Sequence, residues 1–170
     1  MNRNEAHRIP VEAVRNAIVA YADEMANALS KAAYNMMIYE VRDYCCGLID
    51  TQARMISQNR GGLPIFLADL GAAATAAIEI HGRHGFAPGD VLISNDPEAC
   101  GQHLNNIVVM TPFFHEGELI AFTASRAHWV DVGDGNPDRQ HFGLLDDPGR
   151  DHFPVPHKVF HQTILVRLVP

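Results

Sequence analysis

Two short segments of the chain carry side chains that could bind a ligand together. They are Cys100-Gly101-Gln102-His103-Leu104-Asn105-Asn106 and Arg126-Ala127-His128-Trp129-Val130-Asp131-Val132-Gly133. The apolar stretch between them is typical of two paired strands that turn at His115-Glu116-Gly117. Because the first strand of an antiparallel hairpin begins beside the end of the second strand, His103 and His128 should lie close together at one end of the sheet. The spacing therefore predicts a ligand site at one end of a sheet.

The residue types at these positions suit a divalent metal such as Mn, Zn or Mg. Neutral imidazole nitrogens and an oxygen donor bind such ions and leave positions open for water or substrate. The candidate metal ligands are His103, Asn106 and His128. Two carboxylates, Asp96 at the end of the preceding predicted strand and Asp131, are candidates for orienting a ligand or transferring a proton.

Each candidate also has an ordinary explanation. A single histidine near a strand end is often a surface or hydrogen-bonded residue, and Asn106 can cap a turn through its amide. The segment Asp131-Val132-Gly133 can be a simple turn. Residue types alone leave both possibilities open: a metal site, or ordinary surface and turn residues.

The three cysteines are odd in number, and two of them are adjacent: Cys45, Cys46 and Cys100. Adjacent strand residues face opposite sides, so Cys45 and Cys46 would not easily form a disulfide bond. We interpret the cysteines as reduced core thiols, with a nucleophilic role for Cys45 or Cys46 as the alternative.

The elements that would position these residues follow from the hydrophobic periodicity. The pattern indicates an α+β fold with a long N-terminal helix, antiparallel hairpins that pack with an Ala-rich helix, and an irregular C-terminal tail. Predicted helices cover residues 10–34 and 65–81, and predicted strands cover 44–49, 54–57, 90–94, 107–114 and 118–127. The last two strands are apolar almost throughout, which predicts a cover on both faces.

Composition narrows the class of protein. With 170 residues, of which 47% are hydrophobic, the chain can bury one sizeable core. Its formal charge of −7, from 20 acidic and 13 basic residues, argues against a nucleic-acid partner. We find neither an apolar run long enough to cross a membrane nor an apolar signal segment at the N-terminus, and so predict a cytoplasmic protein.

The character of the chain changes after Gly133. Residues 134–170 hold five of the ten prolines and four of the ten histidines, and a regular apolar run returns only at 163–169. A metal site formed by the tail histidines His152, His157 and His161 is a minor alternative. Two prolines interrupt that stretch and prevent a regular helix there.

Several motifs in the same order resemble the N-terminal part of the hydantoinase B/oxoprolinase family. This family includes N-methylhydantoinase B subunits, the C-terminal half of 5-oxoprolinase, and subunits of acetone and acetophenone carboxylases. The resemblance covers about residues 14–133 and rests on Glu40-Val41-Arg42-Asp43-Tyr44-Cys45-Cys46, Pro88-Gly89-Asp90-Val91, Asn95-Asp96-Pro97, Gly101-Gln102-His103-Leu104 and the segment from Arg126 to Gly133.

The resemblance implies an ATP-coupled system of two parts. A hydantoinase A-type ATPase partner would bind ATP and phosphorylate a small cyclic amide or ketone substrate, and the B-type subunit would carry out the following hydrolysis or carboxylation. This chain lacks a Gly-Lys-Ser/Thr phosphate loop, which agrees with ATP being bound by the partner. In the carboxylase relatives the metal ligands are His, Asp and His, so Asn106 stands here where a carboxylate is expected.

Length is the largest departure from the family, whose members are several times longer. We therefore expect residues 1–133 to be the N-terminal part of a hydantoinase B/oxoprolinase-like domain. Residues 134–170 would be a tail outside the family sequence, produced by truncation or a frameshift. The leading hypothesis is a partial B-type subunit of an ATP-dependent amidohydrolase that opens cyclic amides, incomplete and inactive alone. The alternatives are a ketone carboxylase subunit and a non-catalytic interaction fragment.

Overall fold

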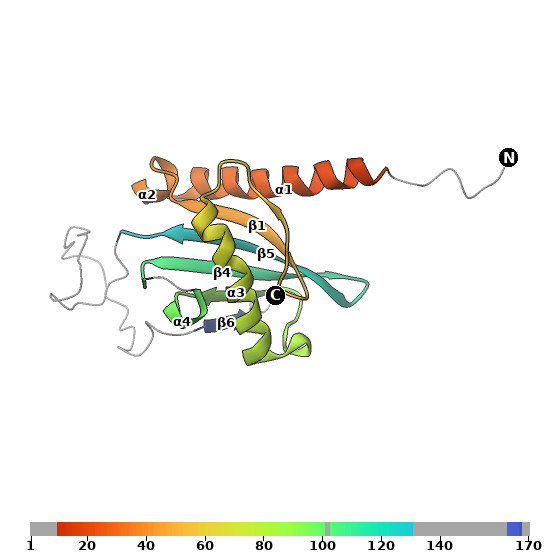
Figure 1. Cartoon of the computed structure of the whole chain (residues 1–170). Helices are drawn as coiled ribbons and strands as arrows, with labels where there is room; N and C mark the ends of the chain where they lie inside the picture. The colour runs from red at the N-terminus through yellow and green to blue at the C-terminus, as the bar shows by residue number, and fades with distance from the viewer. Residues whose placement is uncertain (1–9, 101–102, 131–162, 168–170) are drawn as a thin grey trace.

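A single antiparallel sheet organises the described part of the chain. The structure, a computed structural model, describes residues 10–100, 103–130 and 163–167. Its six strands lie in the order β2-β1-β5-β4-β3-β6 (Figure 1). The strands are β1 (Tyr44–Asp50), β2 (Met55–Gln58), β3 (Asp90–Ser94), β4 (Asn106–His115), β5 (Glu118–His128) and β6 (Thr163–Arg167). The α+β class predicted from the sequence is confirmed.

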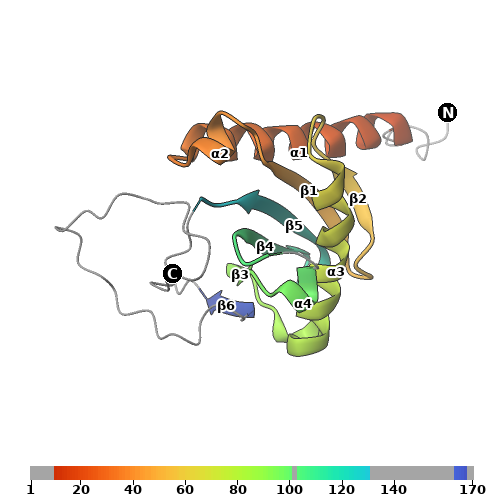
Figure 2. The same cartoon turned by 60° about the vertical axis from the view of Figure 1, so that its left-hand side comes forward.

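Helices lie on both faces of this sheet. The predicted long N-terminal helix is α1 (Val11–Ala32), and the Ala-rich helix is α3 (Pro64–His81). Figure 2 shows α1 along one side of the sheet and α3 across the other. Three short helical segments were not predicted: α2 (Met36–Tyr39), η1 (Arg83–Gly85) and α4 (Pro97–Cys100).

Helix α3 covers the main core because its small side chains allow a close approach. Its buried residues, among them Leu70 and Ala74, pack against the inner side chains of four strands. These strand residues include Ile49, Val108 and Phe122. A Cβ atom at Gly71 would lie 2.9 Å from the Ala53 carbonyl oxygen, so this position requires glycine. The helix ends where predicted, at Gly82, whose φ of 70° favours glycine.

Helix α3 is also the one helix in the described ranges that is long and apolar enough to cross a membrane, by length and composition only. Its buried residues belong to the core described above, and they make up 28% of this segment.

Helix α1 covers the opposite face of the sheet beside β1 and β2. Ala22 is fully buried there, and Ala26 packs with Ile38, Tyr44 and Cys46. Cys45 belongs to the α3 core and Cys46 to the α1 core, so the two thiols do face opposite sides. Both are free and buried, as predicted. The side chain of Cys100 lies outside the described atoms.

The β4–β5 hairpin forms where predicted and turns tightly at two residues with positive φ. These are Glu116, at 50°, and Gly117, at 85°, which is the geometry of a two-residue hairpin turn. The cover predicted on both faces is found on the α3 side. On the α1 side, Phe113 is 55% exposed and Ile120 is 44% exposed. Of the predicted tail, the structure describes only β6, which pairs with β3.

Candidate functional site

The sheet register places the predicted histidines at one end of the sheet. Asn106, the first residue of β4, pairs with His128, the last residue of β5. A turn precedes β4, in which the Asn106 amide donates to the His103 carbonyl oxygen at 3.2 Å. This turn folds His103 back over the strand end. Two segments that are distant in sequence therefore converge through strand pairing, as the hairpin pattern predicted.

The three side chains make a continuous hydrogen-bonded cluster. The Asn106 Oδ1 atom lies 3.2 Å from His128 Nδ1, and Asn106 Nδ2 lies 3.5 Å from His103 Nε2. The two imidazole rings meet edge to face, with centroids 4.9 Å apart. Asn106 is 1% exposed, whereas the His103 ring lies at the rim. The amide is thus a buried bridge between two more accessible rings.

This bridge sets which ring nitrogens carry protons. An amide Oδ1 only accepts and an amide Nδ2 only donates, so His128 Nδ1 donates and His103 Nε2 accepts. In the neutral rings, His128 then keeps the lone pair on Nε2 and His103 keeps its proton on Nδ1. The lone pair on His128 Nε2 can therefore bind a ligand directly. His103 must first give up its contact with Asn106 before its Nε2 atom can do the same.

Burial and two nearby basic side chains favour the neutral form of His103. Partial burial lowers the pKa of His103 from 6.5, and the nearby His128 and Arg126 lower it further, while Asp43 acts in the opposite direction. A neutral imidazole is the form that binds metal or accepts a proton.

Backbone contacts hold the turn that carries His103. The Trp129 amide donates to the Asn105 carbonyl oxygen at 2.8 Å, and the Asn105 side chain donates to the Trp129 carbonyl oxygen at 3.0 Å. From the neighbouring strand end, Asn95 Nδ2 donates to the Leu104 carbonyl oxygen at 3.1 Å. Three strand ends are therefore tied together around the cluster.

The two predicted carboxylates have different outcomes. Asp96 follows β3 at this end of the sheet, and its amide donates to Ser94 Oγ at 3.3 Å. No group of three His, Cys, Asp or Glu side chains suited to a metal exists among the described residues, so Asp96 does not complete such a group with the histidines. Asp131 and the tail histidines lie outside the described residues.

A buried arginine beside the histidines was not assigned from the sequence. Arg126 is fully buried, and its Nη1 atom lies 2.8 Å from Asp69 Oδ2 of α3. Its guanidinium carbon sits 4.8 Å from the centre of the Phe66 ring. Because strand side chains alternate, Arg126 faces the same side of β5 as His128. That two-residue spacing was the available signal, but nothing in the sequence identified Asp69 as the partner.

The cysteines next to this site are not suited to nucleophilic chemistry. Burial raises the pKa of Cys45 to about 12, with a further contribution from Cys46, and burial raises the pKa of Cys46 to about 12 as well. A thiol in this state is protonated at neutral pH and is a poor nucleophile. The interpretation as core thiols therefore fits both residues.

The sequence profile of the family described as hydantoinase B/oxoprolinase matches residues 7–140. The chain belongs to this family. Among curated hydantoinase B/oxoprolinase relatives, the 5-oxoprolinase of Saccharomyces cerevisiae is 36% identical over 112 residues, which cover 65% of this chain and 8% of that protein. Across the curated relatives compared, the chain spans from 8% to 27% of their length.

Two solved structures share the fold of this hydantoinase B/oxoprolinase chain. A nucleotide-free acetone carboxylase superposes with a TM-score of 0.65 at 22% identity, covering 74% of this chain and 17% of that one. The ATP-dependent caprolactamase of Pseudomonas jessenii superposes with a TM-score of 0.61 at 26% identity, covering 82% and 25%.

Proposed function

We propose that this chain supplies part of the second site of an ATP-dependent amidohydrolase of the hydantoinase/5-oxoprolinase type. In this proposal a hydantoinase A-type ATPase partner phosphorylates the carbonyl oxygen of a small cyclic amide, and the site described above takes part in opening the ring with water. The observation that carries the proposal is the His103–Asn106–His128 cluster, built from strand ends at the edge of a family domain.

The cluster fits a divalent metal in part. Two imidazoles with centroids 4.9 Å apart are close enough to share one ion, and an amide oxygen is a further donor. This set has no carboxylate, which predicts weak binding of a hard cation. His103, Asn106 and His128 would hold the metal, and to do so they would have to exchange the hydrogen bonds that they make with one another for bonds to the ion. The metal would polarise a substrate oxygen and lower the pKa of a bound water.

The remaining residues act on protons and orientation. The free Nε2 atom of His128 points its lone pair away from the Asn106 bridge, so in the absence of metal it can accept a proton from water. Asp96 and Asp131 would orient the ligands or receive that proton in the assembled enzyme. The ion pair between the buried Arg126 and the partly exposed Asp69 holds the end of β5 against α3 and so positions His128.

ATP would be bound by the partner. The Gly61-Gly62 loop of this chain packs on α1, where the Arg60 amide and guanidinium both donate to Asp23. Because no Gly-Lys-Ser/Thr follows the loop, it lacks the lysine and hydroxyl that a phosphate loop supplies. This agrees with the division of labour in the proposal.

A ketone carboxylase subunit is the second candidate, and the fold shared with acetone carboxylase favours it. The third is an interaction fragment that binds a partner without turnover.

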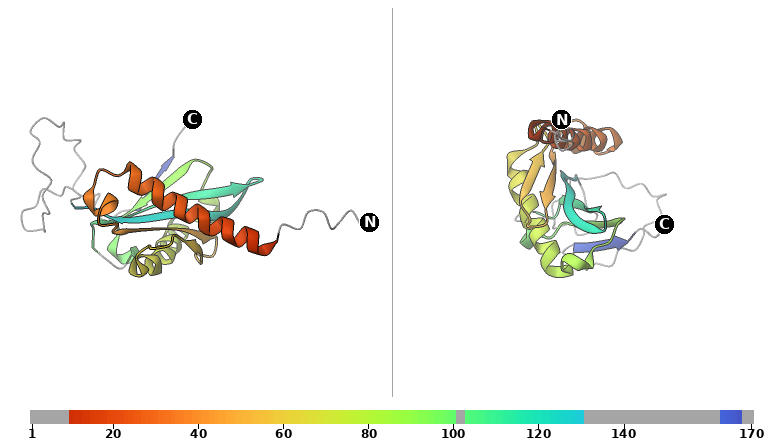
Figure 3. Two further views of the ribbon diagram at one scale, coloured as in Figure 1. Left: turned by 90° about the horizontal axis from the view of Figure 1, so that it is seen from above. Right: turned by 90° about the vertical axis from the view of Figure 1, so that its right-hand side faces the viewer.

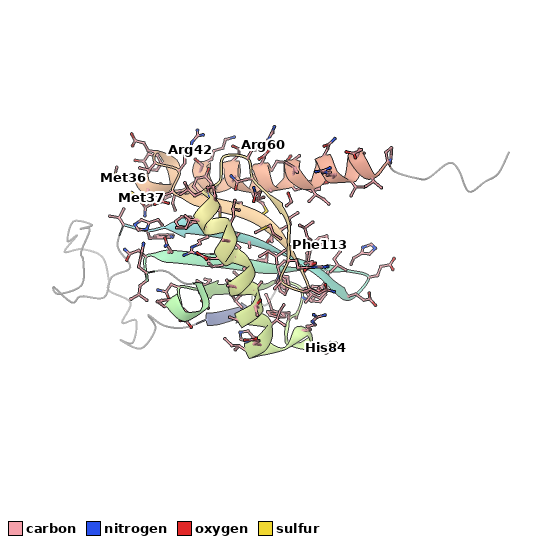
Figure 4. The ribbon with its side chains drawn as sticks, in the orientation of Figure 1. Met36, Met37, Arg42, Arg60, His84 and Phe113 are labelled. Atoms are coloured by element: carbon pink, nitrogen blue, oxygen red, sulfur yellow. The ribbon has the colours of Figure 1, made fainter. Side chains whose placement is uncertain are left out.

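Coexpression with a hydantoinase A-type protein from the same source separates these candidates. We expect a complex that opens 5-oxoproline, hydantoin or caprolactam only with ATP. His128→Ala should reduce ring opening at least about hundredfold, since it removes the free nitrogen. The matched control is His84→Ala, because His84 is exposed on η1, away from the cluster (Figure 4).

Three outcomes would contradict the proposal. Turnover of a ketone that depends on bicarbonate would support the carboxylase. A stable complex that turns over neither kind of substrate would support the interaction fragment. Equal activity of the His128→Ala and His84→Ala variants would remove the cluster from the reaction.

A further inference from the structure

A polar pocket lies between α1, the start of β1 and the loop that follows β2. Helix α1 packs along β1 and β2, as the two views of Figure 3 show. The pocket has a volume of about 290 Å³, and polar side chains reach it from all three segments. They are Asp23, Asn27 and Ser30 of α1, Arg42 and Tyr44 beside the start of β1, and Asn59 and Arg60 of the loop.

The one carboxylate among these lining residues is already paired. The Arg60 amide and its Nε atom donate to the two oxygens of Asp23 at 2.7 and 2.8 Å, and Nη2 lies 2.8 Å from Oδ2. These hydrogen bonds, with the one from the backbone amide first, lower the pKa of Asp23. The Asp23–Arg60 pair is electrically neutral, so the lining keeps one net positive charge, on Arg42.

Arg42 has an unusual backbone conformation for a residue with a side chain. Its φ of 61° lies in the left-handed region, which glycine adopts more easily than arginine. The other non-glycine residues with positive φ in the described ranges, Ala53 and Glu116, lie in hairpin turns, whereas Arg42 lies between α2 and β1. The Tyr44 amide holds this bend by donating to the Arg42 carbonyl oxygen at 2.9 Å. Arginine at a strained position points to a role for its side chain.

We propose that the polar pocket binds the carboxylate or phosphate group of a small-molecule ligand, with the Arg42 guanidinium as the main contact. A guanidinium presents parallel N–H donors that match two oxygens of such a group. The Ser30 and Tyr44 hydroxyls and the Asn27 amide can donate beside it. Figure 4 shows Arg42 and Arg60 beside α1. These residues are separate from the histidine cluster, so the anion site does not depend on the proposed ring-opening function.

An NMR titration of the full chain at constant ionic strength tests the anion site. We expect saturable shifts of the Arg42 and Tyr44 amides with inorganic phosphate if the ligand group is a phosphate, and with acetate if it is a carboxylate. Arg42→Gln should weaken this binding at least about tenfold, because it removes the charged donor of the pocket. Arg42 is exposed, so the variant should keep the fold of the parent.

Two further variants separate the anion site from net charge and from backbone strain. Arg83→Gln removes the same charge from an exposed position of η1 and should bind like the parent. Arg42→Gly should lose binding and yet unfold at a higher temperature than Arg42→Gln, since glycine adopts positive φ without strain. The absence of saturable shifts with both anions would overturn the proposal, and so would equal affinities of the parent and Arg42→Gln.

Discussion

The Asn106 amide decides how the two histidines can act. In the structure it holds His128 through Oδ1 and contacts His103 through Nδ2. A carboxylate at this position would accept from both rings instead of donating to one. It would also add a negative charge to the ligand set, which hard divalent ions favour. The difference between this chain and the His-Asp-His pattern is therefore one of charge and of proton arrangement at the same place.

Asn106→Asp should strengthen the binding of Mn²⁺ or Zn²⁺ by at least about tenfold, because a charged oxygen replaces a neutral one. The metal-free variant should lose about 1–3 kcal/mol of stability, since residue 106 is buried. Isothermal titration calorimetry measures the first effect and thermal unfolding measures the second. Asn16→Asp is the control, because it makes the same substitution at an exposed position of α1, away from the histidines. Equal gains in both variants would mean that net charge alone governs binding.

At the residue scale, the sequence predicted which histidines meet but not how they are connected. His103 and His128 follow from the hairpin register alone. The bridge through Asn106 depends on side-chain orientation at the strand end, which spacing does not specify. Arg126 was visible two residues before His128, yet its role depends on Asp69 from a helix 57 residues away in sequence. No local pattern contains such a contact.

Among the elements, periodicity was sufficient where a helix or strand has one buried face. Helices α1 and α3, and the hairpins β1–β2 and β4–β5, lie within a few residues of their predicted ranges. The short helix α2 was missed because its start depends on one local contact, in which Asn35 Oδ1 accepts from the Met37 amide. Among the described residues, Phe113 and Ile120 on the α1 side stay partly exposed, and an apolar strand does not reveal which segment covers it.

The ion pair between α3 and β5 gives a test at the scale of elements. Arg126 is fully buried, whereas the Asp69 side chain is 25% exposed. Asp69→Asn should therefore destabilise the fold by about 3–5 kcal/mol, because it replaces the carboxylate that pairs with a buried charge by a neutral amide. Arg126→Met should cost less, since it leaves an aspartate that water can still reach. Urea unfolding measures both variants.

Two further variants complete this test. The double variant Asp69→Asn with Arg126→Met should have a free energy of unfolding close to that of Arg126→Met alone, because the buried charge is absent from both. Asp50→Asn provides a comparison for a partly exposed carboxylate in the β1–β2 turn, where we expect a loss of at most about 1 kcal/mol. If Asp69→Asn loses no more stability than Asp50→Asn, the Asp69 carboxylate is not needed to stabilise the buried Arg126 side chain.

For the whole molecule, the position of the histidine cluster links ligand binding to folding. The cluster joins the ends of β4 and β5, and the Asn95 contact with Leu104 adds the end of β3. These strands also form the centre of the α3 core. A ligand held by both histidines would bind the folded chain and not the unfolded one, so its binding energy adds to the stability of the entire domain.

The pH dependence of this stability follows from the lowered pKa of His103. Well above pH 6.5 the ring is neutral in both the folded and the unfolded chain and contributes no slope. Below that value the unfolded chain takes up its proton first, so stability falls as the pH drops towards the lower pKa of the folded state.

A bound metal also competes with protons for the same nitrogens. At neutral pH, free metal at one hundred times its dissociation constant should add about 2.7 kcal/mol, and this increment should disappear as the medium becomes acidic. Thermal unfolding with and without Zn²⁺ across this pH range measures both effects. His103→Ala should abolish the metal increment, whereas His115→Ala, which changes an exposed ring at the far end of β4, should retain it. Stabilisation by metal that survives in His103→Ala would place the ion elsewhere on the molecule.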